Sequence, residues 1–161
     1  IAEKFIDYRF PFGEPVRLVE ETDHTQKKAF VLGVYASAVH ARWRGPDGQT
    51  LVSALAVASE PEIFWTGENA KVKPAEIIEM IQLPEGAGTL EPATSNLNGP
   101  SGRSLDTDIL TPLGLTRADT WLCDCVPHAC MNPSQRESVE TKYDTFAGVD
   151  LPSYNMPPPP K

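Results

Sequence analysis

The stretch Val31-Leu-Gly-Val-Tyr-Ala-Ser-Ala38 decides the fold class that we predict for this chain. With Ala29 and Phe30 before it, it forms a continuous apolar run that leads into a polar turn. Such a run is typical of a strand that is buried on both faces of a parallel sheet. A second strand is predicted over Arg117–Val126 and ends beyond the triplet Cys123-Asp-Cys125. Because ligands bind at the carboxyl ends of parallel strands, the two strands predict one wall of a crevice.

The remaining segments predict an α/β domain. Residues 38–44 and 50–57 alternate around Gly45-Pro-Asp-Gly48, which is typical of a β-hairpin. Helices are predicted over 74–81, over 101–113 with a cap at Ser101 or Ser104, and from the capping box at Asn132–Gln135 onward. Residues 83–100 are predicted to form a long loop. We therefore expect a three-layer α/β/α domain over 28–150, with a short, mostly parallel sheet and a hairpin insertion. An N-terminal arm (1–27) precedes it and a Pro-rich tail or linker (151–161) follows it.

Composition limits the classes of partner. The chain has 161 residues, 40% of them hydrophobic, and no apolar run approaches the ~20 residues that span a bilayer. We therefore expect a cytoplasmic protein without a membrane partner. The net charge of -8 argues against strong non-specific binding to DNA. Arg42, Arg44 and Arg103 form either a local basic strip for a nucleic-acid backbone or ordinary solvated charges.

Three cysteines, Cys123, Cys125 and Cys130, lie within eight residues of one another, close to His128. An odd, clustered set does not make a disulfide framework and fits a reducing compartment. Only one residue separates the first two cysteines, whereas zinc pairs usually have two to four between them. We therefore predict neither a metal site nor a cofactor.

Two further motifs carry a resemblance to a known family. Ser101-Gly-Arg-Ser-Leu-Asp106 is followed by Gly114-Leu-Thr-Arg-Ala-Asp119 and then by a strand that contains Cys123-Asp124. In this order, and after the turn that begins at Gly33, they resemble the uracil-DNA glycosylase superfamily, in particular its iron-sulfur type. The resemblance covers about residues 28–40 and 99–132. It implies DNA repair by hydrolysis of the N-glycosidic bond of a base that is flipped out of DNA.

The chain also departs from that family. Val34 and Tyr35 stand where the family carries a water-activating acid or amide, and neither side chain is a general base near neutral pH. Asp124 replaces an asparagine that both donates and accepts hydrogen bonds. An ionised aspartate only accepts, so we expect a base or another ligand that presents an amino group. The second motif of the family, which contains a histidine, is not found in this sequence. The position at which the family carries one ligand of its iron-sulfur cluster falls near His128. Catalytic residues are therefore not assigned.

A base-sized pocket is the leading hypothesis for the site. Its predicted ligand-binding residues are Gly33, Tyr35, Ser37, Phe64, Trp65, Asp124 and His128. The predicted partner is DNA or a free nucleobase or nucleotide, and the oligomeric state stays open. The alternative is a non-catalytic module that binds a nucleobase, a nucleotide or another protein. In that case Tyr35 and Ser37 are an ordinary strand exit, Asp124 a cap, and Phe64 and Trp65 core packing.

The C-terminal residues Pro157–Pro160 cannot continue a central strand. Two parallel strands alone would leave one sheet edge unpaired. We therefore expect either that the chain continues past Lys161, or that the domain has an exposed edge and a half-open cleft above Gly33 and Asp124.

Overall fold

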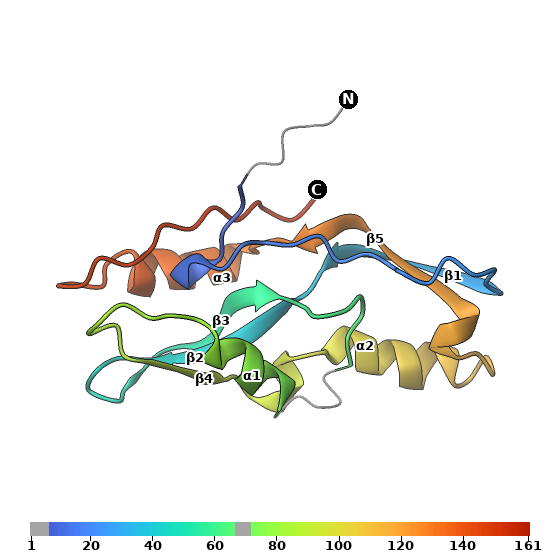
Figure 1. Ribbon diagram of the computed structural model, residues 1–161, viewed down its shortest axis with the longest axis horizontal. Coiled ribbons are helices and arrows are strands. Elements are labelled where there is room, and N and C mark those ends of the chain that lie inside the picture. Colours follow the sequence, from blue (N-terminus) through green and yellow to red (C-terminus); the bar gives the residue numbers. More distant parts are fainter. Residues whose placement is uncertain (1–6, 67–71) are drawn as a thin grey trace.

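A computed structural model describes residues 7–66 and 72–161 (Figure 1). It mixes helices and strands, as expected, with one parallel pair of strands and one antiparallel sheet. Strand β1 (Ala29–Ala36) pairs in parallel with β5 (Thr120–Ala129), and Gly33 lies opposite Asp124 in the register. These are the two strands that the apolar runs predict, although β5 begins three residues later than expected.

A second sheet is antiparallel. Strands β2 (Ala38–Arg44), β3 (Thr50–Ser59) and β4 (Thr89–Pro92) lie in the order β3-β2-β4. The hairpin of β2 and β3 is confirmed, but β4 lies inside the segment 83–100 that we expected to be a loop. The described strands thus form two small sheets rather than one mostly parallel sheet.

Helices cover these sheets. Helix α1 (Lys73–Glu79) contacts the antiparallel sheet, and α2 (Pro100–Ser104) runs on into the π-helix η3 (Leu105–Leu110). Helix α3 (Pro133–Ser138) runs on into the π-helix η5 (Val139–Tyr143). The short 3-10 turns are η1 (Pro11–Gly13), η2 (Ser95–Leu97) and η4 (Arg117–Asp119). In the described part of the chain, no helix is both long and apolar enough to cross a bilayer.

The start of α2 differs from the expected one, and the start of α3 does not. Gly99, in the left-handed region, precedes α2, and neither Ser101 nor Ser104 caps it. Because the π-helical turns change the spacing, the expected apolar face is broken: Leu105 and Leu110 are buried, while Ile109 and Leu113 are exposed. The capping box between Asn132 and Gln135 is confirmed.

Strand β1 is buried on one face only. Phe30, Leu32 and Val34 are 55–60% exposed, so the expectation of burial on both faces is wrong. The opposite face packs Val31 and Ala36 into an apolar cluster with Leu105, Leu110 and Leu122. The two-stranded sheet therefore rests on η3, and on its other face the β1 side chains are exposed while Trp121 of β5 contacts His24.

The main core lies around Trp43. Its ring makes edge contacts with Phe12 and Tyr143, which join the N-terminal segment and η5 to the antiparallel sheet. The C-terminal segment is extended, as its prolines predict, and it is packed: Met156 is buried, and Asn155 pairs with Arg9. The two terminal segments accordingly run side by side (Figure 1).

Candidate functional site

A cleft of about 430 Å³ opens where β1 leads into β2. The end of β1, the start of β2 and the first turn of α3 line it, together with Glu60, Phe64 and Asp124. It lies at the carboxyl end of β1, where the pairing of the two parallel strands ends. This is the part of a parallel sheet at which ligands usually bind.

Five of the seven predicted ligand-binding residues line this cleft: Gly33, Tyr35, Ser37, Phe64 and Asp124. Trp65 does not, because its side chain is only 2% exposed and belongs to the main core. His128 does not line it either, since its ring lies against that of Tyr8, with 5.3 Å between the ring centroids. The structure thus separates these two side chains from the other five.

Gly33 lets two groups approach the backbone of β1. A Cβ atom at this position would lie 2.0 Å from Oδ1 of Asp124 and 2.8 Å from Cζ of Phe64. Both distances are too short for any side chain, so residue 33 has to be glycine for the carboxylate and the ring to occupy these places. The carboxylate and the aromatic ring therefore lie together over Gly33.

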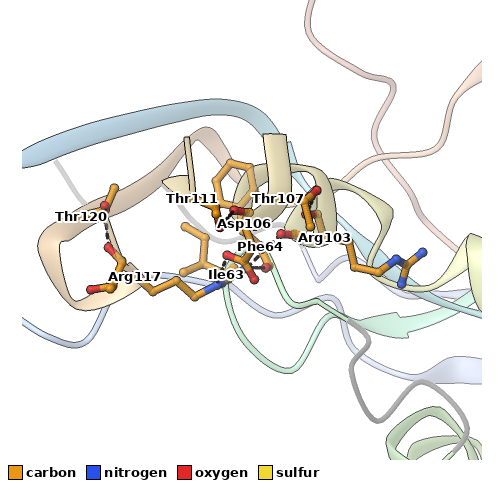
Figure 2. Close-up of polar contacts among 10 residues, drawn as sticks. Ile63, Phe64, Arg103, Asp106, Thr107, Thr111, Arg117 and Thr120 are labelled. Carbon is orange, nitrogen blue, oxygen red and sulfur yellow. Dashed lines mark hydrogen bonds and ion pairs between the residues drawn. The ribbon is translucent and has the colours of Figure 1, made fainter. Parts of the chain in front are cut away.

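Arg117 holds the loop that carries Phe64 (Figure 2). Its guanidinium donates to the carbonyl oxygen of Phe64 at 2.6 Å and to that of Ile63 at 3.4 Å, and it pairs with Asp106 at 2.8 Å. Phe64 has a φ of +49°, a strained value for a bulky residue, so the loop needs such support. Gly102 gives further support, because a Cβ atom there would meet the carbonyl oxygens of Phe64 and Trp65. The two motifs that carry the family resemblance thus position Phe64.

Glu60 is a cleft residue that the sequence interpretation missed. It follows β3 directly and is 4% exposed. Its Oε1 accepts the amide N–H of Ser37 at 3.1 Å, and its own N–H donates to the carbonyl of Ser37. Burial, with the Asp124 carboxyl close by, raises the pKa of Glu60 to about 7. An acid directly after a buried strand is the signal that could have drawn attention to it.

His40 is a second missed residue. Gln135 uses its Oε1 to accept the N–H of Asn132, so its Nε2 is left to donate to Nε2 of His40 at 3.2 Å. Burial lowers the pKa of His40 below its usual range. The imidazole is therefore neutral and serves as a fixed polar group of the cleft wall.

The other candidate groups are engaged elsewhere. Arg42 and Arg44 both pair with Glu91, and Arg103 donates to the carbonyl oxygens of Thr66 and Asn98. In the part of the chain that the structure describes, no lysine or arginine lines the cleft. Nor do three histidine, cysteine, aspartate or glutamate side chains gather as metal ligands anywhere in residues 7–66 and 72–161.

The burial of Asp124 is the remaining electrostatic feature of the site. It raises the pKa of this carboxyl above its usual range.

Comparison with protein family models, with curated proteins and with solved structures found no match. The cleft and the motifs that resemble the uracil-DNA glycosylase superfamily are therefore the features of this chain that bear on function.

Proposed function

We propose that this cleft binds a nucleobase and that the chain is a uracil-DNA-glycosylase-like domain, which hydrolyses the N-glycosidic bond of a base flipped out of DNA. The observation that supports this most is that Glu60, whose pKa is raised to about 7, shares one cleft with the Phe64 ring. A flipped base needs a stacking surface, and hydrolysis needs a proton acceptor that is active near neutral pH. This proposal includes the three-layer arrangement, a role in DNA repair and a cytoplasmic location. The free thiols of the three cysteines fit that location.

Glu60 supplies the group that the first motif lacks, since Val34 and Tyr35 cannot accept a proton there. In the proposed reaction the ionised Glu60 takes a proton from a water molecule, and the water oxygen forms a bond to the sugar C1′. The C1′–N bond breaks, and its electron pair leaves with the base. The proton then passes from Glu60 to the departing base, which restores the carboxylate. Phe64 holds the base during these steps.

The test is the release of free base from single-stranded oligonucleotides that carry uracil, hypoxanthine or guanine. Glu60→Gln keeps an acceptor for the Ser37 N–H but removes the proton acceptor. Because general base catalysis is typically worth about 10²- to 10⁴-fold, we expect this variant to lose that much rate. Glu62→Gln, a change at an exposed neighbour, is the matched control and should keep the rate. If the unaltered protein releases no more base than Glu60→Gln, the protein is not a glycosylase of this kind.

A second candidate function is a module that binds a nucleobase without cleaving it, or one that binds another protein. Val34 and Tyr35 favour it, because the first motif keeps its backbone turn but not its reactive group. Thermal stabilisation by bases or nucleosides, together with no base release from any oligonucleotide, would support the base-binding form. A defined protein partner without stabilisation by any base would support the other.

A further inference from the structure

The carboxylate of Asp124 has no hydrogen-bond donor within the described part of the chain, although it is half-buried. Glu60, the other acid of the cleft, accepts the N–H of Ser37. Asp124 lines the cleft, and the thiol of Cys123 donates to its backbone oxygen, not to its carboxylate. A half-buried carboxylate without a donor is costly unless something else supplies one. The cleft itself is where a donor could come from.

The position of this carboxylate defines which part of a ligand it meets. Oδ1 of Asp124 and the tip of the Phe64 ring lie over the same glycine, Gly33. Because the carboxylate lies next to the tip of that ring, a base stacked on the ring can place its hydrogen-bonding edge against Asp124. As a carboxylate, Asp124 only accepts, and its two oxygens best match two parallel N–H donors.

The nucleobases differ in this respect. Guanine presents N1–H and its 2-amino group side by side, so a carboxylate can accept from both. Uracil and hypoxanthine present one N–H next to a carbonyl oxygen, which a carboxylate repels. Adenine and cytosine place an acceptor beside their amino group. Since no lysine or arginine lines the cleft in the described residues, a phosphate finds no cation there.

We propose that the cleft takes a guanine-type base, whose N1–H and 2-amino group both donate to the Asp124 carboxylate. This rests on the proposed function in that it assumes a base on Phe64. The base can come from a free nucleoside or from a flipped nucleotide of DNA, and the chemistry at Asp124 is the same in both.

The experiment compares the affinity of the protein for guanosine, inosine, xanthosine and uridine. Inosine lacks the 2-amino group and xanthosine carries a carbonyl oxygen in its place, whereas the purine ring is otherwise kept. Because a bidentate pair gives about 1–3 kcal/mol of discrimination, guanosine should bind about 5- to 150-fold more tightly than inosine. Xanthosine and uridine should bind no better than inosine. A guanine-containing single strand should likewise bind more tightly than the same strand with hypoxanthine.

Asp124→Asn turns one acceptor into a donor and should reduce the preference for guanosine over inosine to less than about threefold. Asp150→Asn, which removes one negative charge at an exposed site, is the control and should keep it. If Asp124→Asn does not fold, the nucleoside series on the unaltered protein decides alone. Equal affinity for guanosine and inosine, or no binding of any nucleoside, overturns the inference. If the protein releases base from DNA but binds guanosine and inosine equally well, the proposed function stands and the guanine preference is wrong. If it prefers guanosine but releases no base, the guanine preference stands and only the proposed hydrolysis is wrong.

Discussion

At the scale of single residues, Glu60 and Asp124 give the cleft its chemistry. One carboxyl is fixed by the backbone of Ser37, and the other has no donor in the described protein. Both have a raised pKa because burial disfavours their charged forms. Two acids with different surroundings in one cleft can have different roles. In our proposal Glu60 accepts a proton from water, and Asp124 accepts hydrogen bonds from the edge of the base.

The raised pKa of Glu60 predicts how stability depends on pH. The pKa rises from 4.5 to about 7 on folding, so the folded protein holds this proton more tightly than the unfolded chain. The contribution of Glu60 to stability is therefore fully present below about pH 4.5 and is lost as the pH rises through about 7. A shift of this size corresponds to about 3 kcal/mol. Urea unfolding of Glu60→Gln should show less loss of stability across this range than the unaltered protein, and a Glu62→Gln control should not. Parallel pH profiles for Glu60→Gln and the unaltered protein would contradict the assignment.

At the scale of elements, the loop after β3 depends on η4 and α2. Arg117 donates to backbone carbonyls of this loop and pairs with Asp106, so it holds Phe64 in its strained conformation. The sequence resemblance marks the same turn, and the structure gives it a mechanical role: it places an aromatic ring at the cleft.

Replacing Arg117 should loosen that loop. Arg117→Ala removes charge-assisted hydrogen bonds that are worth about 2 kcal/mol together. We expect faster hydrogen exchange at residues 63–66 and weaker nucleoside binding. The control is Arg42→Ala, whose partner Glu91 lies near the surface, and it should cost less than about 1 kcal/mol. Unchanged exchange at residues 63–66 in Arg117→Ala would show that the loop is held by other contacts.

The two faces of β1 predict a matched pair of variants. Leu32→Glu changes a side chain that is 55% exposed and should alter the free energy of unfolding by less than about 0.5 kcal/mol. Val31→Glu places a charge against the apolar cluster around Leu122 and should cost more than about 2 kcal/mol. Chemical denaturation measures both. Equal costs would mean that the outer face of β1 is covered.

Much of the element order could be predicted from the sequence, and the reasons for the failures are physical. Apolar runs, the Gly45–Gly48 turn and the Asn132 capping box are local signals, and the structure contains the elements that they predict. Strand β4 was missed because turn-forming residues surround it, and it is a strand only through its pairing with β2. The exposed face of β1 and the burial of Glu60 depend on which elements meet in space, which no local pattern encodes. The ends of the strands and an aromatic pair led to five of the cleft residues. Of that aromatic pair, Trp65 packs in the main core instead of lining the cleft.

At the scale of the whole molecule, the two terminal segments complete the main core. Phe12 contacts Trp43 and Tyr143, and Met156 is buried in the same cluster. The amide of Met131 donates to the carbonyl of Pro157, which ties the C-terminal segment to the end of β5. This segment does not line the cleft above Gly33 and Asp124.

Met156 tests the role of the C-terminal segment. Met156→Ala removes most of a buried side chain and should lower the free energy of unfolding by about 2–4 kcal/mol. Pro158→Ala, at an exposed position of the same segment, should have an effect of less than about 0.5 kcal/mol. Similar unfolding curves for the two variants would contradict the packing of this segment against the core.

Chemical shifts of backbone amides in NMR spectra test most directly whether the cleft over Gly33 binds a nucleobase. The protein is titrated in turn with guanosine, inosine, cytidine and uridine. We predict saturable changes in chemical shift that cluster at Gly33, Ser37, Phe64 and Asp124 and are largest with guanosine. The amide signals of β4, which belongs to the other sheet, should not shift. No saturable shift at these four residues with any nucleoside, or shifts that cluster elsewhere, would contradict the claim.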